Sequence, residues 1–302
     1  MSTLLRFLAC CFVALIVSDL WADENKAGDA AEGHLLRYRF DAGQTLRWSV
    51  THRSLVRSTV SGTTQNAETF STSVKVWRVA EVKPDGTARF EQMVEDIDMR
   101  HQLTGREEVR YNSRTDRKPP PGFDDVASTI GVPLAELVID ARGKVLERKQ
   151  KAKKAQASST GEITIILPEK PVAVGDSWTE PHDLCATTGT GAFVRIKAQQ
   201  RFTLENVKTG VATIALATQI LTPIHDPAIE AQVAQHAIDG VVRFDIDAGR
   251  ILSQQVEVDR RVVGFRGHAS SLHYATRFTE EFRSAKETEV ASRAVESAGT
   301  LR

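Results

Sequence analysis

The chain has 302 residues, and its 39 Lys and Arg balance its 39 Asp and Glu, so the formal net charge at pH 7 is zero. This balance excludes a global electrostatic field that would steer the protein towards nucleic acid or an anionic membrane surface. With 41% hydrophobic and 26% charged residues, the composition is that of a globular protein of one large domain or two ordinary ones.

The first 22 residues have the layout of a secretory signal peptide. Arg6 supplies positive charge, residues 7–17 form an unbroken apolar run, and Ala22 stands directly before Asp23. The run is shorter than the roughly 20 residues of a transmembrane helix. We therefore expect cleavage after Ala22 and a secreted or periplasmic mature chain with no transmembrane segment. An uncleaved N-terminal anchor is the alternative.

Residues 23–33 are small and polar, which predicts a disordered lead-in. Cleavage of the signal would remove Cys10 and Cys11 and leave Cys185 alone. A single cysteine excludes an intramolecular disulfide, so the stability of the mature chain must come from its core.

From residue 34 onward the dominant pattern is the alternation of apolar and polar residues. Four apolar sets show it: Leu46, Trp48 and Val50; Met93, Ile97 and Met99; Leu252, Val256, Val258 and Val262; Leu272, Tyr274, Phe278 and Phe282. One apolar and one polar face per strand is typical of antiparallel sheets. Several such runs exceed ten residues and are joined by tight turns such as Pro84-Asp85-Gly86. We predict a mainly β fold of long, curved antiparallel strands, resembling a half-barrel.

Two short helices are expected among these strands. Asp226 can cap a helix that starts at Pro227 and ends at Gly240. A second helix is predicted over residues 123–130, before Gly131.

Three glycine-containing patterns recur in the same order along the chain. They pair residues 42–48 with 174–178, residues 82–88 with 207–212, and residues 139–146 with 246–252. The repetition predicts an internal duplication, and coincidence of turn chemistry is the alternative. The expected division is a β repeat over 34–150, a linker over 151–161, a second β repeat over 162–283, and a flexible tail over 284–302.

The densest polar cluster is the segment His182-Asp183-Leu184-Cys185. A His and a Cys three residues apart suit zinc, but a zinc site needs three or four ligands and the other histidines have no metal spacing. We interpret Cys185 as a thiol without a catalytic or metal-binding role. The segment Gly189-Thr190-Gly191 lacks the lysine of a phosphate-binding loop and predicts a flexible hairpin or a loop. Residues 267–271 lack the nucleophile-elbow pattern and predict a turn between strands.

Three acidic pairs and one basic run complete the candidates for chemistry. The pairs are Glu107-Glu108, Asp124-Asp125 and Glu280-Glu281. Neighbouring residues point to opposite faces of a strand and lie about 100° apart on a helix, so none is a ready acid–base pair. The basic run over residues 148–154 is interpreted as a solvated linker. We therefore expect no catalytic residue, no metal and no cofactor.

Three stretches resemble uncharacterised exported proteins of planctomycete-type bacteria. They are residues 167–172 running into 175–178, residues 244–250, and residues 270–274. The resemblance implies a cell-envelope or secreted setting and brings no catalytic residues. Long strands with short helices are also similar, at the level of fold, to the curved half-barrels of the LolA/LprG lipoprotein-carrier superfamily.

These observations predict a non-enzymatic, exported cell-envelope protein with no nucleic-acid partner. It would hold a hydrophobic or lipid-like ligand on a concave apolar sheet, or act as an assembly scaffold that binds another envelope protein. The alternative is a hydrolase with an unrecognised active site. An apolar cavity would favour the carrier, and several titratable groups converging in one cleft would favour the enzyme.

Overall fold

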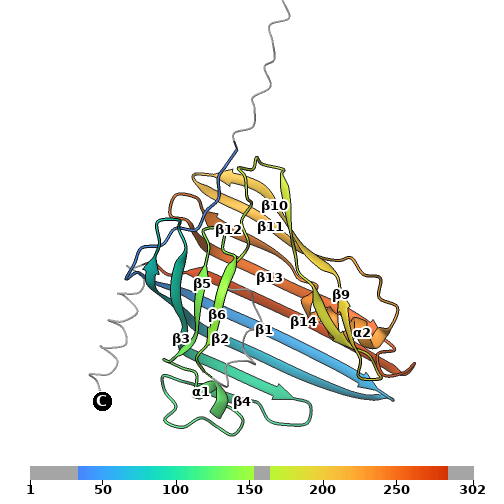
Figure 1. Ribbon diagram of the computed structural model, residues 1–302. Coiled ribbons are helices and arrows are strands. Elements are labelled where there is room, and N and C mark those ends of the chain that lie inside the picture. The colour runs from blue at the N-terminus through green and yellow to red at the C-terminus, as the bar shows by residue number, and fades with distance from the viewer. Residues whose placement is uncertain (1–32, 153–163, 285–302) are drawn as a thin grey trace, which may run out of the picture. The chain divides into compact units, whose positions relative to one another are not determined.

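The computed structural model describes residues 33–152 and 164–284 (Figure 1). The predicted signal peptide and almost all of the predicted lead-in, linker and tail lie outside the described residues. Among the described residues, no helix combines the length and the apolar character needed to cross a membrane.

A single antiparallel sheet of twelve strands dominates the fold, so the predicted fold class is confirmed (Figure 1). Its order is β6-β5-β3-β2-β1-β14-β13-β12-β11-β10-β7, and β4 pairs with β3 beside β5. The strands are β1 (Thr45–Val60), β2 (Thr63–Val82), β3 (Ala88–Leu103), β4 (Val109–Asn112), β5 (Pro133–Ile139), β6 (Val145–Gln150), β7 (Ser177–Pro181), β10 (Ala198–Lys208), β11 (Val211–Ile220), β12 (Asp239–Asp245), β13 (Arg250–Val263) and β14 (Ser270–Phe282). A separate hairpin consists of β8 (Leu184–Thr187) and β9 (Phe193–Ile196).

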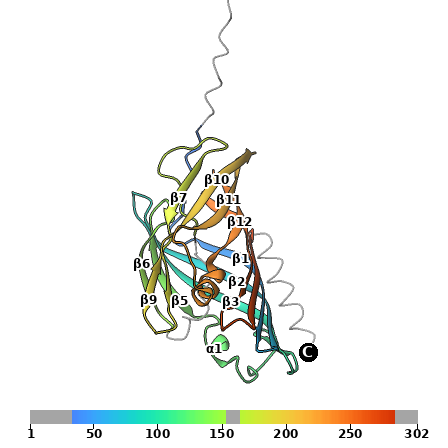
Figure 2. The ribbon, with the colours of Figure 1, turned by 90° about the vertical axis from the view of Figure 1, so that its right-hand side faces the viewer.

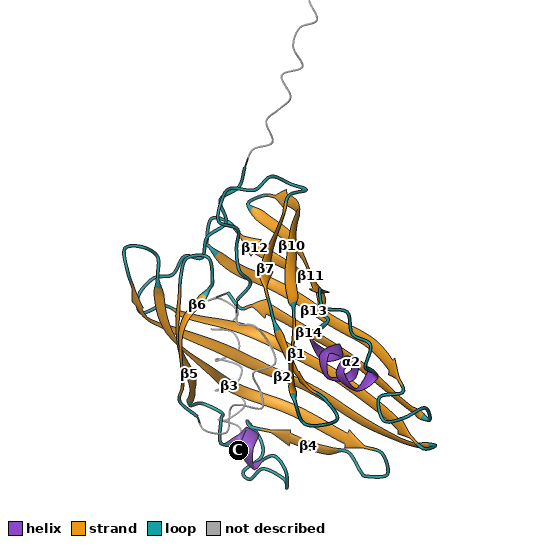
Figure 3. Ribbon diagram, turned by 45° about the vertical axis from the view of Figure 1, so that its right-hand side comes forward, coloured by secondary structure: helices purple, strands orange, loops and turns teal. Residues whose placement is uncertain are grey.

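Tight turns allow consecutive long strands to pair over their full length. Ser61 and Gly62 both have positive φ, at 49° and 80°, and join β1 to β2 with Val60 opposite Thr63. Two central residues of positive φ match the right-handed twist of a two-residue hairpin. Thr209 and Gly210 form the same kind of turn between β10 and β11. Figure 3 shows the resulting long strands side by side.

Both predicted helices are present, and both are shorter than the sequence suggested. The helix α1 spans Asp124–Ala127 and α2 spans Pro227–Val233. The side chain of Asp226 accepts a hydrogen bond from the backbone N–H of Ala228, as expected for its cap. A 3-10 turn, η2 (Ala234–His236), follows α2, and the predicted end at Gly240 is wrong because that residue already belongs to β12.

The two faces of the sheet have different roles, and we call them inner and outer. The inner face carries Trp48, Trp77 and Phe282, whereas the outer face carries their strand neighbours such as Arg47 and Glu281. Figure 2 views the sheet from its side and shows it curving, with α2 within the curve. Inner positions near the β2–β3 turn are buried, so the core lies at that end of the inner face.

Two segments outside the strands complete this core. Leu36, Tyr38 and Phe40 come from one, and Ile165 and Leu167 come from the other. The backbone of the first segment binds both halves of the sheet: the N–H of Tyr38 donates to Ala141, and the N–H of Arg39 donates to Gly249. Val172, which lies outside the named strands, also contributes to this core. The remaining core residues lie on strands of both halves of the sheet: Leu46, Trp48, Trp77, Val79, Ala88, Phe90, Ala135, Leu137, Ile139, Phe202, Leu204, Ala212, Ile214, Leu216, Val242, Phe244 and Ile251.

Two of the predicted apolar sets change face because of irregularities in the ladder. The pairing of β2 with β3 shifts between Ser73 and Lys75, so Ile97 is an inner residue while Met93 packs against Val74 and Val76 on the outer face. A shift between β12 and β13 places Ile251 opposite Phe244, and Leu252 does not take the inner position that was expected of it. An extra residue in one strand reverses the alternation beyond it.

The basic run also differs from the expectation. Residues 148–150 belong to β6, an exposed strand at one edge of the sheet, and are not a linker. Strand β5 offers β6 a hydrogen-bonding edge, and a charged exposed strand protects that edge against further pairing.

The strand order is compatible with the predicted duplication. Gly86 lies between β2 and β3 and Gly210 between β10 and β11, while Gly143 lies between β5 and β6 and Gly249 between β12 and β13. In the two series of strands β1-β2-β3-β5-β6 and β7-β10-β11-β12-β13, Gly86 and Gly210 both follow the second strand, and Gly143 and Gly249 both follow the fourth. The duplication and the boundaries assigned to its repeats stay predictions.

Candidate functional site

Beyond the core, the long strands continue and carry an apolar inner surface that we call the open half. Its apolar side chains are all half-buried: Val50, Val56, Ile97, Met99, Leu103, Leu272, Tyr274 and Phe278. The neighbouring outer positions are mostly polar or charged. Of the four predicted apolar sets, the one on β14 (Leu272, Tyr274, Phe278 and Phe282) lies entirely on the inner face, as expected.

A polar stripe crosses this apolar surface along β1, β2 and β14. The hydroxyl of Thr276 donates to the backbone carbonyl of Arg53 at 2.7 Å, and His52 Nε2 lies 2.8 Å from the same hydroxyl oxygen. Because the hydroxyl proton is already directed at the carbonyl, His52 Nε2 is the donor in this contact. Burial lowers the pKa of His52, which favours the neutral form of its ring. Thr69 makes a second contact of this kind, 3.0 Å from His101 Nδ1.

An ion pair marks the boundary between the core and the open half. Lys75 Nζ lies 2.6 Å from both carboxylate oxygens of Glu280, and the two side chains are only 11% and 2% exposed. The ammonium also lies 4.8 Å from the ring of Trp48 and 5.0 Å from that of Trp77. A buried charged group remains ionised only when an opposite charge or hydrogen-bond partners lie close to it, as they do here. A hollow beside the pair has a volume of only about 10 Å³, too small for a ligand.

One part of the inner face is covered by α2 and the β8–β9 hairpin. Val233 packs with Leu184 and Ile196 in a small second core. Val258 and Val262, on the inner side of the neighbouring β13, are 3% exposed. The open half is therefore the portion of the inner surface that lies beyond both cores.

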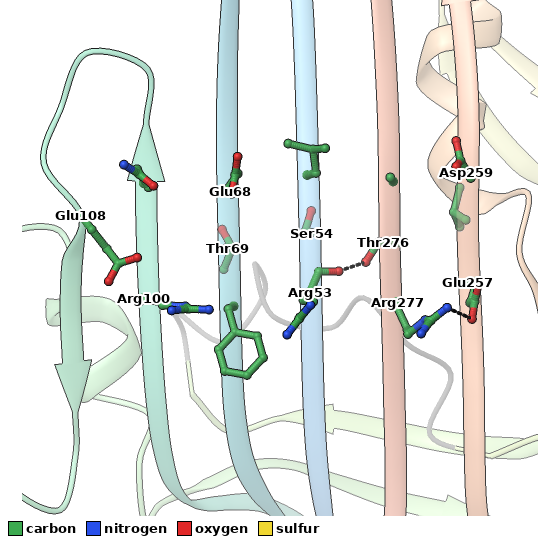
Figure 4. Close-up of a pocket in the computed structure, with 15 residues that line it drawn as sticks. Arg53, Ser54, Glu68, Thr69, Arg100, Glu108, Glu257, Asp259, Thr276 and Arg277 are labelled. Atoms are coloured by element: carbon green, nitrogen blue, oxygen red, sulfur yellow. Dashed lines mark hydrogen bonds and ion pairs between the residues drawn. The ribbon is translucent and has the colours of Figure 1, made fainter.

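The large hollow lies on the outer face, on the opposite side of the sheet from the open half. It has a volume of about 550 Å³ and crosses β3, β2, β1, β14 and β13 (Figure 4). Its charged lining residues are Arg53, Glu68, Arg100, Glu108, Glu257, Asp259 and Arg277. Apart from Glu108, which precedes β4, these residues share a face of the sheet with Leu55 and Phe70, opposite to that of Trp48.

The segment that contained the candidate zinc ligands does not gather them. Cys185 is exposed on β8 and lies opposite Arg195. Asp183 forms an ion pair with Arg195. The pKa of His236 is lowered, mainly by burial and to a smaller extent by the charge of His182. Among the described residues, no group of three or more His, Cys, Asp and Glu side chains could hold a metal ion.

The other sequence candidates occupy the local structures that were expected. Gly189 and Gly191 belong to the turn of the β8–β9 hairpin, and residues 267–269 turn the chain from β13 into β14. In the pair Glu280-Glu281, the first residue is buried on the inner face and the second is exposed.

Sequence reasoning missed the Lys75–Glu280 pair and the arginines of the outer hollow. The first had a detectable signal, because Lys75 shares an alternating face with Trp77 and Val79, and Glu280 shares one with Phe278 and Phe282. A charged residue at an inward position of a strand indicates a buried partner. The arginine row had no such signal, since it depends on the register between strands far apart in the sequence.

Comparisons with known proteins show two weak structural likenesses and one match to a family of unknown function. In solved structures, the chain resembles one titled "Lipid-protein interactions in lipovitellin", with a TM-score of 0.46 and 11% identity over 82% of this chain. The chain spans only 26% of that protein's length. A crystal structure of a DUF1329 family protein from Desulfovibrio piger gives a TM-score of 0.14 and 12% identity, over 81% of this chain and 87% of that one. Likenesses this weak carry no argument about function.

No curated protein matches the chain. Residues 144–248, about a third of the sequence, match the family described as "Family of unknown function (DUF6263)". Over that region, which runs from the β5–β6 turn to the β12–β13 turn, the chain is similar to DUF6263 proteins.

Proposed function

We propose that this chain is a non-enzymatic binding protein that holds a lipid-like ligand against the open half of the inner face. The observation that supports this proposal is the set of half-buried apolar side chains there, beyond the reach of either core. Each Val, Leu or Phe side chain that a ligand covered would contribute roughly 1 kcal/mol, about half of its full burial.

The mixed chemistry of the open half favours an amphiphile over a pure hydrocarbon. Apolar side chains such as Val56 and Phe278 flank the stripe that contains His52, Thr69 and Thr276. Ligand pockets commonly combine an apolar lining with a few polar groups that fix orientation. A polar group along the ligand would lie over the stripe and its apolar chains on either side.

The curvature of the inner face favours a small ligand over a flat protein surface. The sheet bends around α2, and a ligand within the same curve would contact several strands at once (Figure 2). We further propose that the protein acts in the cell envelope after export, because its first 22 residues resemble a signal peptide.

Native mass spectrometry tests this proposal directly. The protein is expressed with its own N-terminus, purified from the envelope fraction without detergent, and measured under native and denaturing conditions. We expect a lipid-sized mass excess that disappears on denaturation, on a chain that starts at Asp23. A chain without any ligand that co-purifies in a stable complex with an envelope protein would favour the scaffold. Substrate turnover would favour the hydrolase.

A further inference from the structure

The outer hollow contains a row of three arginines and one phenylalanine that the proposed function does not use. Strand register places Arg100 opposite Phe70, Phe70 opposite Arg53, and Arg53 opposite Arg277. Figure 4 shows Arg100 on β3, Arg53 on β1 and Arg277 on β14, with β2 between the first two. At about 4.8 Å per strand, the row extends across roughly 14 Å of the surface.

Two of these guanidinium groups are positioned by the aromatic ring between them. The guanidinium carbon of Arg53 lies 5.2 Å from the centre of the Phe70 ring, and that of Arg100 lies 4.8 Å from it. A cation–π contact restricts the positions of a guanidinium group and leaves N–H groups available to a ligand. The Phe70 ring therefore holds both groups near one place on the outer face.

Neither of these two arginines forms an ion pair within the described residues, although the charge of Arg100 contributes to the lowered pKa of Asp98. Arg277 binds Glu257 at 2.8 Å and Arg110 binds Asp98 at 2.6 Å, whereas no ion pair of the described residues involves Arg53 or Arg100. Two positive groups converging on one ring repel each other, and a shared anion would relieve that repulsion. Planar, bidentate binding of carboxylate or phosphate is the recognition that guanidinium groups perform best.

The acidic residues of the hollow restrict where such an anion could lie. Asp259 is bound to His273 at 2.8 Å, but Glu68 and Glu108 also line the hollow. Glu68 is two residues from Phe70 on the same strand, a separation of about 7 Å. An anion over Phe70 would therefore contact the two arginines and feel repulsion from Glu68.

We propose that Arg53 and Arg100 form a binding site for a phosphate or carboxylate group on the outer face. The ligand is a small organic anion or the headgroup of an anionic lipid, and the two sources share this chemistry. The site is independent of the lipid-like ligand proposed for the inner face, because the two lie on opposite sides of the sheet. The chain has no net charge, so a general attraction for anions does not account for binding.

Isothermal titration of the mature chain with pyrophosphate and with citrate tests the proposal, and flotation with phosphatidylglycerol vesicles distinguishes the lipid source. The variants are Arg53→Gln, Arg100→Gln and Glu68→Gln. The matched control is Arg57→Gln, which removes the same charge from the same face of β1 outside the hollow. We expect about tenfold weaker binding for each of the first two variants, tighter binding for Glu68→Gln, and little change for the control.

Each outcome decides the matter. Loss of pyrophosphate or citrate binding confined to Arg53→Gln and Arg100→Gln supports a soluble anion. The same pattern with phosphatidylglycerol vesicles alone supports a lipid headgroup, with phosphatidylcholine vesicles as the neutral reference. Absence of binding to all three probes overturns the proposal, and so does an equal loss in Arg57→Gln, which would indicate non-specific attraction. Neither result bears on ligand binding at the inner face.

Discussion

Replacing Lys75 with methionine should destabilise the protein strongly, because it leaves Glu280 buried without its partner. Methionine keeps most of the aliphatic volume over Trp48 and Trp77 and removes only the ammonium. The carboxylate of Glu280 is 2% exposed, and within the described part of the chain it also accepts a hydrogen bond from Gln254 Nε2, at 3.4 Å. Removing one member of a buried pair costs about 3–5 kcal/mol, so we expect Lys75→Met to lose that much free energy of unfolding.

The double variant Lys75→Met, Glu280→Gln separates the penalty of an orphaned charge from the loss of packing. A neutral amide beside Gln254 has a smaller desolvation cost, so the double variant should lie within about 2 kcal/mol of the wild type. Urea unfolding followed by tryptophan fluorescence measures all variants, with Glu280→Gln completing the cycle. A cost below about 1 kcal/mol for Lys75→Met, or a double variant no more stable than the single one, would refute a buried ion pair.

Three further outcomes follow from the structure. Because the pKa of His52 is lowered in the folded protein, the native state binds fewer protons than the unfolded state near and below pH 6.5. The free energy of unfolding should therefore fall as the pH drops below 6.5. His52→Asn should make that fall smaller when urea unfolding is measured at a series of pH values. Gly143→Ala should cost more than Gly175→Ala in thermal unfolding, because both have positive φ but only the former places a Cβ 2.5 Å from Tyr38; equal costs would exclude the clash. Residues 34–150 and 162–283 expressed separately should not fold, as circular dichroism would report, because both halves contribute to one core; a cooperatively folded half would contradict this.

Much of the architecture could be predicted from the sequence because alternation and turn chemistry are local. The face of β14 follows from the spacing of Leu272, Tyr274 and Phe278, and the start of α2 follows from Asp226 and Pro227. These signals depend on the geometry of one strand or one helix end, which neighbouring residues set by themselves.

What could not be predicted depends on which strands become neighbours. The irregular pairing near Lys75 moved Met93 to the outer face, and no local pattern announces such a shift. The row of Arg53, Phe70 and Arg100 arises only when β1, β2 and β3 pair in their observed register. The inner polar stripe is equally non-local, since His52 meets Thr276 across two hundred and more positions of sequence.

The central claim is that a lipid-like ligand binds the inner face of the open half, and one pair of variants tests it most directly. Val56 and Leu55 are neighbours on β1, both half-buried, with Val56 on the inner face and Leu55 on the outer. Val56→Asp and Leu55→Asp therefore make the same change of charge on opposite sides of one strand.

A fluorescent monoacylglycerol probe, which has no charge and therefore is no ligand for the arginines beside Leu55 in the outer hollow, is titrated into the wild type and both variants, after urea unfolding has shown that each is folded. The account predicts that Val56→Asp weakens probe binding at least tenfold, because a carboxylate would lie against the apolar chain, while Leu55→Asp binds as the wild type does. Equal binding by all three proteins, or a loss confined to Leu55→Asp, would contradict it.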